Sequence, residues 1–205
     1  IMMLLQNVYD ILNEHIILCL YLVFVLGFVP VMETFLQWNE NRPYKVILHD
    51  PILSRLSTYD TSNIVTTCTL VSHIQVVLWL IYSANWERQL IQLLTVYLGV
   101  ASLRLLFMFV CPLQVHPNSI PLDDKIIQSF LHSHTPFTHD LMFSGHIAQQ
   151  VILLLFFPSY TLWCTILLSF LGILFSKVHY CIDMLVSPFV TFTVFHIVTH
   201  YLIPD

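Results

Sequence analysis

Charged side chains are scarce in this chain. They make up 9% of its 205 residues, whereas hydrophobic side chains make up 57%. A soluble domain carries about 25% charged residues, so a soluble fold of this length would expose too much apolar surface to water. Lipid is the solvent that accepts such a surface. The seven lysines and arginines are also too few for a nucleic-acid-binding protein.

Closely spaced cysteine pairs are lacking as well. The five cysteines lie apart from one another, in or beside apolar runs: Cys19, Cys68, Cys111, Cys164 and Cys181. None of their spacings matches a metal or redox motif, so we expect no disulfide framework. We interpret them as small apolar packing residues. The first turns contain no lysine or arginine, which does not favour a signal peptide.

Long apolar runs predict an all-α fold, a polytopic membrane bundle of about six transmembrane helices. A membrane helix needs roughly 20 predominantly apolar residues, and windows of that kind cover about 16–38, 63–84, 90–111, 140–157, 161–177 and 180–203. We see no repeat or interdomain linker, so we expect one membrane domain over residues 1–205. The expected location is that of a multi-pass integral membrane protein.

Two long connections, about 39–62 and 112–139, lie on the same side of the membrane if the helices alternate in direction. That side carries five of the basic residues, and the other carries Arg88 alone; the five are Arg42, Lys45, Arg55, Lys125 and Lys177. The positive-inside rule then predicts that the long loops face the cytoplasmic side.

The first stretch with chemical potential is Asp140-x3-Ser144-Gly145-His146, at the start of the fourth predicted helix. The chain has only four glycines, and Gly145 allows a close approach to the backbone. A helix N-terminus presents unpaired N–H groups and a positive dipole end, which suit a phosphate. His146 could protonate a leaving oxygen beside it.

The second stretch is His179-Tyr180-x-Ile-Asp183, at the start of the sixth predicted helix. Residues four apart share a helix face. We therefore predict that Asp183 accepts a hydrogen bond from one ring nitrogen of His179, which would leave the other nitrogen as a nucleophile. Pairing would also relieve the cost of a carboxylate within a membrane helix.

Arg104 lies well inside the third apolar run, where an isolated guanidinium costs roughly 3 kcal/mol or more. A phosphate is its natural bidentate partner. Because the third helix runs toward the long-loop side, and the fourth and sixth start there, we expect Arg104 to lie near both histidine motifs.

These motifs resemble the lipid phosphatase and phosphotransferase superfamily that includes the type-2 phosphatidic acid phosphatases. The nearer branch resembles the sphingomyelin synthases and their bacterial relatives. The resemblance covers about residues 98–195 and is carried by Asp-x3-Ser-Gly-His, by His-Tyr-x-Ile-Asp and by Arg104 followed by Pro112. The Lys-x6-Arg-Pro motif of the classical phosphatases is absent. Members of the family usually place this site on the luminal or outer face, opposite to the face indicated by the charge count.

The resemblance implies a membrane enzyme that moves a phospho-headgroup between lipids through a phospho-histidine intermediate. It implies that His179 is the nucleophile, Asp183 its orienting partner, and His146 the general acid and later base. The substrate-binding residues would be Arg104, Ser144, Gly145, Asp140 and Tyr180. The implied substrates are a phospholipid and a lipid alcohol, either ceramide or diacylglycerol, with no cofactor and no resident metal.

Three alternatives remain open. One is a lipid phosphate phosphatase, in which water replaces the alcohol. Another is a structural subunit of a larger membrane complex, with a vestigial site. The third is a metal site, for which two clusters offer ligands, His132-x-His134-x4-His139-Asp140 and His196-x3-His200. We interpret His73 and Gln75 in the second helix as hydrogen-bonding to neighbouring helices.

Overall fold

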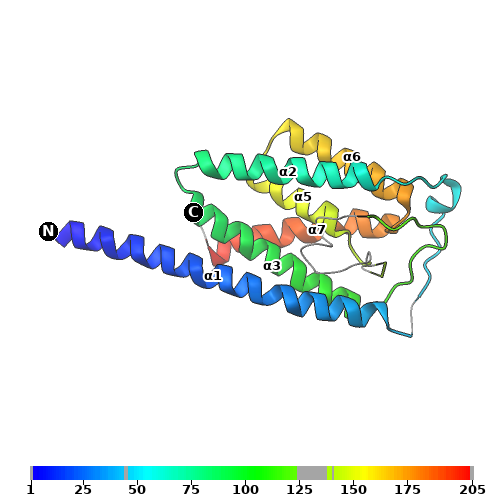
Figure 1. Ribbon diagram of the computed structural model, residues 1–205, viewed down its shortest axis with the longest axis horizontal. Coiled ribbons are helices and arrows are strands. Elements are labelled where there is room, and N and C mark those ends of the chain that lie inside the picture. The colour runs from blue at the N-terminus through cyan, green and yellow to red at the C-terminus, as the bar shows by residue number, and fades with distance from the viewer. Residues whose placement is uncertain (1, 44–45, 124–137, 140, 204–205) are drawn as a thin grey trace.

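The protein is a bundle of helices, as the apolar runs predict. The computed structural model describes residues 2–43, 46–123, 138–139 and 141–203, and for residues 2–15, 17, 18 and 21 it describes the backbone alone. Within these ranges it has six α-helices and no β-strand. The helices are α1 (Met2–Glu40), α2 (Ser62–Tyr82), α3 (Trp86–Val110), α5 (Gly145–Phe156), α6 (Tyr160–Ser176) and α7 (Cys181–Ile197) (Figure 1). The predicted all-α fold class is confirmed.

Four helical stretches are long and apolar enough to cross a membrane: Leu22–Glu40, Ser62–Tyr82, Trp86–Val110 and Cys181–Leu202. The last includes a π-helical turn, Val198–Leu202, that continues α7. By contrast, α5 has 12 residues and α6 has 17. At 1.5 Å per residue they are about 18 and 26 Å long, shorter than a hydrocarbon layer of about 30 Å.

The fourth predicted helix therefore starts too early in the window 140–157, because α5 begins at Gly145. Two local features delay the helix. Met142 has a φ of 109°, which a right-handed helix does not accept, and the Ser144 hydroxyl caps α5 by accepting a bond from the Ile147 N–H. Leu141 and Phe143 are buried around this turn. Irregular backbone is tolerated at membrane depth when protein surrounds it, so α5 can begin inside the bundle.

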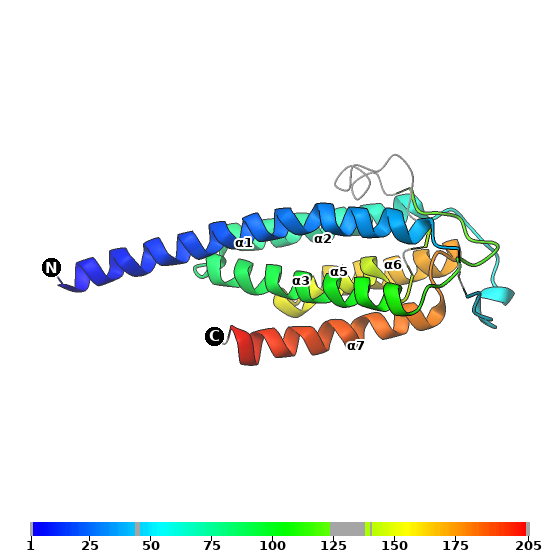
Figure 2. The same ribbon diagram turned by 90° about the horizontal axis from the view of Figure 1, so that it is seen from below.

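The central helix of the bundle is α5. It packs against α2, α3, α6 and α7, whereas α1 packs against α3 on the outside. The largest apolar cluster lies around α5 and includes Phe143, Ile152 and Leu153. The first part of α1 extends past the other helices in both views (Figures 1 and 2).

Small and polar residues hold neighbouring helices together. A Cβ at Gly99 would lie 2.8 Å from Val194, and a Cβ at Gly172 would lie 2.8 Å from Val65, so both glycines permit close contact between helices. Polar pairs also join α2 to its neighbours. The Gln75 amide donates to the Ser159 hydroxyl at 2.5 Å, and His73 Nε2 lies 2.6 Å from the Gln149 amide nitrogen. The interpretation of His73 and Gln75 as interhelical residues is confirmed.

The described parts of the two long loops lie at one end of the bundle, where α1 and α3 end and where α5 and α7 begin (Figures 1 and 2). The loops are joined by backbone hydrogen bonds. The Val46 N–H donates to the Pro112 carbonyl at 2.9 Å, and the Gln114 N–H donates to the Val46 carbonyl at 2.8 Å. This end of the bundle contains both histidine motifs.

Candidate functional site

The two histidine motifs meet through their backbones. The Ser144 N–H, just before α5, donates to the carbonyl of Asp183 in the first turn of α7 at 3.3 Å. One turn further along α7, the Ser187 hydroxyl donates to the Ser144 carbonyl at 2.7 Å. The start of α5, with His146 as its second residue, is thereby fixed against the start of α7. Because its side chain also caps α5, Ser144 is a positioning residue.

Arg104 joins this junction from α3. A Cβ added at Gly145 would collide with the Arg104 guanidinium, at 2.6 Å from its central carbon and 2.9 Å from Nη2. The guanidinium therefore lies directly over the first residue of α5. Gly145 therefore allows the Arg104 guanidinium to approach the backbone closely. The positive charge of Arg104 adds to the positive dipole end and the N–H groups at the N-terminus of α5. The prediction that Arg104 lies beside the Ser-Gly-His motif is confirmed.

His179 and Asp183 are neighbours, but they do not share a helix face. The chain is non-helical at His179, and α7 begins two residues later at Cys181. The Asp183 carboxylate accepts the Tyr180 N–H at 3.2 Å, and its Oδ2 lies 3.6 Å from His179 Nδ1. That distance is too long for a hydrogen bond. The predicted hydrogen bond between His179 and Asp183 on a shared helix face was therefore wrong. His179 lies before α7, and the Asp183 carboxylate caps that helix instead.

The His179–Asp183 pair is nevertheless placed for an acid–base partnership. The side chains have exposed fractions of 6% and 1%, and His179 Nδ1 and Asp183 Oδ1 have no hydrogen-bond partner among the described residues. Catalytic hydrogen bonds are often long before substrate binds and shorten afterwards. A rotation of the imidazole would bring Nδ1 within bonding distance of the carboxylate.

Tyr180, for which the resemblance implies substrate binding, makes its bonds within the protein. Its ring is buried, and its hydroxyl donates to the Gln114 carbonyl at 2.7 Å while it accepts the Leu48 N–H at 3.3 Å. Tyr180 therefore ties the two long loops to the start of α7. The remaining predicted substrate-binding residue, Asp140, lies outside the described residues.

A carboxylate that the motifs did not indicate also supports the site. Asp50 accepts the Cys181 N–H at 2.8 Å through one oxygen, and the N–H groups of Ile52 and Leu53, both at 3.0 Å, through the other. Partial burial raises the pKa of Asp50, but the bonds from these N–H groups outweigh it, so the pKa lies below its ordinary value of 3.8. Asp50 is thus an ionised cap for α7.

Replacing Asp50 with alanine should therefore destabilise the protein near neutral pH by about 0.5–2 kcal/mol, the cost of losing a helix cap. Because the folded pKa is depressed, the carboxylate stabilises the fold above about pH 3.8 and loses this effect as the pH falls through the folded pKa. Thermal unfolding in detergent at pH 7 and at pH 3 measures the difference. A gap between Asp50→Ala and wild type that stayed equally large at pH 3 would contradict the capping role. His49→Ala, an exposed neighbour, is the control.

The end of α1 holds the segment that leads toward α5. The Glu40 carboxylate accepts the N–H groups of Thr138 and His139, both at 2.6 Å, and lies 2.6 Å from His139 Nδ1. The Asn39 amide donates to the His139 carbonyl at 2.7 Å. His139 is therefore engaged by a carboxylate.

Neither proposed metal cluster is supported within the described residues, where no group of three suitable ligands is found. In the first cluster, His132, His134 and Asp140 lie outside the described residues. In the second, the rings of His196 and His200 have centroids 4.2 Å apart, and no third ligand joins them in the described part of the chain.

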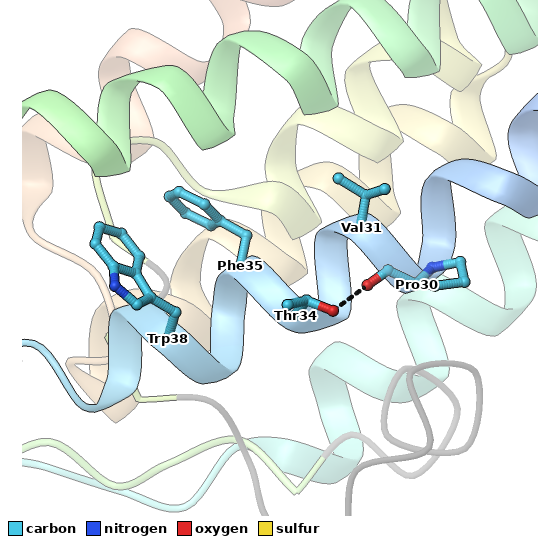
Figure 3. A pocket seen from close by; sticks show the side chains of 5 residues that line it. All are labelled: Pro30, Val31, Thr34, Phe35 and Trp38. Atoms are coloured by element: carbon cyan, nitrogen blue, oxygen red, sulfur yellow. Dashed lines mark hydrogen bonds between the residues drawn. The ribbon is translucent and has the colours of Figure 1, made fainter.

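Two surface hollows lie away from the histidine junction. One, of about 530 Å³, is lined along a single face of α1 by Pro30, Val31, Thr34, Phe35 and Trp38, and the Thr34 hydroxyl bonds to the Pro30 carbonyl there (Figure 3). The other, of about 740 Å³, is an apolar groove between α1, α3 and α7 that includes Gly99 and Ser102. Ser102 and Arg104 are two residues apart, about 200° around α3, so the groove and the guanidinium lie on different faces.

No family model matches the chain, and no curated protein matches it. What the site can do is therefore argued from its own residues. The joined starts of α5 and α7 carry His146 and the His179–Asp183 pair, and the Arg104 guanidinium lies over the first residue of α5. These residue types at helix N-termini are suited to an anion and to acid–base chemistry. Sequence reasoning missed Asp50 because 131 residues separate it from Cys181.

Proposed function

We propose that the protein is a multi-pass membrane enzyme that moves a phospho-headgroup between lipids, as its resemblance to the sphingomyelin synthases implies. The observation that carries the proposal is the meeting of Arg104, the Ser-Gly-His segment and the His179–Asp183 pair at the joined starts of α5 and α7. The helix termini and the guanidinium suit a phosphodiester. The apolar bundle provides access from the lipid layer, where such phosphodiesters lie.

In the first half of the reaction, an imidazole nitrogen of His179 attacks the phosphorus of a phospholipid. A nitrogen–phosphorus bond forms and the bond to the lipid alcohol oxygen breaks, while protonated His146 gives its proton to that oxygen. Asp183 orients the imidazole and stabilises the positive charge that develops on it. Arg104 neutralises the phosphate oxygens as their charge redistributes.

In the second half, an acceptor takes the headgroup from His179. The hydroxyl of ceramide or diacylglycerol attacks the phosphorus, His146 accepts its proton, and the nitrogen–phosphorus bond breaks. With water as the acceptor the same residues would hydrolyse the donor, and with a lipid phosphomonoester such as phosphatidic acid as the donor that reaction is the phosphatase alternative. The acceptor therefore decides between transferase and hydrolase.

The products of the purified protein test the proposal. We expect incubation with choline or ethanolamine phospholipids and ceramide or diacylglycerol to yield a new phospholipid that carries the donor's headgroup, as measured by lipid mass spectrometry. Transfer that depends on the acceptor supports the transferase, and headgroup release without acceptor supports the phosphatase. Phosphatidic acid is added as a third donor, because a phosphomonoester is the substrate of a lipid phosphate phosphatase. Unchanged lipids with all three donors would contradict both enzymatic proposals.

A second candidate is a structural subunit of a membrane complex. It is favoured by the 5% exposed fraction of His179. This candidate predicts unchanged lipids in the product experiment and copurification with a membrane partner. The unpartnered Nδ1 of His179 favours the enzyme, because a group with a purely structural role would be expected to use its bonding capacity.

A further inference from the structure

Lys177 has an unusual backbone conformation and lies between α6 and His179 in the chain. It follows α6 directly as its C-cap, with a φ of 57° and a ψ of 27°, and it is two residues before His179. The left-handed conformation is normally taken by glycine or asparagine at the end of a helix, because a side chain with a Cβ is strained there. The lysine is therefore held at a cost in backbone energy.

The Lys177 side chain is also buried without a counter-ion. Its exposed fraction is 3%, and no hydrogen bond or ion pair to its ammonium is found in the part of the chain that the structure describes. Asp50 accepts three N–H groups and Asp183 accepts that of Tyr180, and neither carboxylate forms an ion pair with Lys177 within the described residues. Burial of a residue with an unpaired charge is costly, so an anion bound at the ammonium would lower that cost.

The neighbourhood of Lys177 is the start of α7. His116 lies on the second long loop. Burial, the largest effect, and the charge of Lys177 both lower the pKa of His116, whereas the charge of Asp50 raises it. His116 therefore lies within electrostatic range of both the lysine and the carboxylate that caps α7. The same loop is fixed to the end of α6 by the Ile120 N–H, which donates to the Ser176 carbonyl at 2.8 Å. Lys177 therefore lies at the end of α6 next to this loop, two residues before His179 in the chain.

We propose that Lys177 is a second phosphate-binding cation of this site and that its missing counter-ion is the phosphate of the lipid attacked by His179. Arg104 approaches the phosphate from α3 across the start of α5, and Lys177 approaches from the end of α6. The chemical class of ligand is a lipid phosphodiester. This inference rests on the proposed function for its lipid substrate, whereas the anion-binding role of Lys177 is measurable without turnover.

Phosphate binding by full-length variants in detergent tests the proposal. The probes are inorganic phosphate and dihexanoylphosphatidylcholine, each titrated while thermal unfolding is followed. We expect Lys177→Met to weaken binding of both probes at least tenfold, and Lys177→Arg to stay within about threefold of wild type. Arg55→Gln, which removes an exposed charge from a loop at the same end, should bind as wild type does.

The stability of Lys177→Met without added probe separates binding from structure. Because methionine removes a buried unpaired charge at similar volume, we expect its unfolding midpoint to equal or exceed that of wild type. A lower midpoint with unchanged phosphate affinity would identify a structural lysine and overturn the proposal. Weaker binding of inorganic phosphate alone would overturn the lipid assignment, and failure of either probe to bind wild type would overturn the site.

The same titrations distinguish this proposal from the proposed function. If Lys177 controls phosphate affinity while the protein leaves all lipids unchanged, the anion site stands and the enzymatic function fails. If headgroup transfer occurs and Lys177→Met binds both probes as wild type does, the function stands and the assignment of Lys177 fails.

Discussion

Replacing His179 with alanine lowers the rate of headgroup transfer by at least about 10³-fold, because the variant lacks the nucleophile and the remaining groups cannot form the intermediate. The measurement is the initial rate of product formation from a headgroup-labelled phospholipid in detergent micelles. The fold should survive, since no hydrogen bond from either ring nitrogen of His179 is found among the described residues and its Nδ1 is unpartnered.

His196→Ala is the matched control for this variant. His196 lies on the same helix, α7, near its other end and exposed, so its loss removes an imidazole without touching the junction. We expect its rate to stay within about twofold of wild type. Equal rates in wild type and His179→Ala would remove His179 from the mechanism.

Replacing Gly145 with alanine is the second change with a large expected effect. The new Cβ would occupy the position of the Arg104 guanidinium, so the flexible arginine must move away from the start of α5. A hydrogen bond to a charged group is worth about 1.5–3 kcal/mol, so we expect transfer to slow by about 10- to 100-fold. Stability should change little, because alanine is the better helix former and only the end of one side chain moves.

A double-mutant cycle shows whether the effect passes through Arg104. In an Arg104→Ala background the added methyl group displaces nothing, so Gly145→Ala should then cost little further activity. Gly27→Ala is the control, because a Cβ at Gly27 meets no atom within 4 Å. Full additivity of Gly145→Ala and Arg104→Ala would show that the two residues act separately.

The apolar runs predicted that a helix lies at each of the six described positions, because hydropathy responds to the lipid solvent and not to tertiary contacts. They did not predict that α1 begins at Met2, well before the predicted run 16–38. The predicted second run, 63–84, and fifth run, 161–177, each lie within two residues of α2 and α6 at both ends. The start of α5 was missed because it depends on the turn at Met142 and the cap at Ser144, which shorten a continuous apolar window.

The sequence predicted that Arg104, His179 and Asp183 lie near one another, but it did not predict their hydrogen bonds. Spacing placed His179 and Asp183 together, and the direction of α3 placed Arg104 near Gly145. The spacing could not show that one carboxylate oxygen of Asp183 accepts the Tyr180 N–H, because this hydrogen bond depends on where α7 begins. The sequence indicated Lys177 only as one of the basic residues of the loops. Its burial at the end of α6, next to the second long loop, depends on tertiary structure and is not visible in the local sequence.

Trapping the covalent intermediate tests the central claim most directly. The wild-type protein is incubated with headgroup-labelled choline or ethanolamine phospholipid without acceptor, quenched at alkaline pH, digested and analysed by peptide mass spectrometry. We predict a phospho-headgroup on His179 that disappears when ceramide or diacylglycerol is added and that is absent from His179→Ala. Turnover of the lipid with an unmodified His179, or with the headgroup on another residue, would contradict the account.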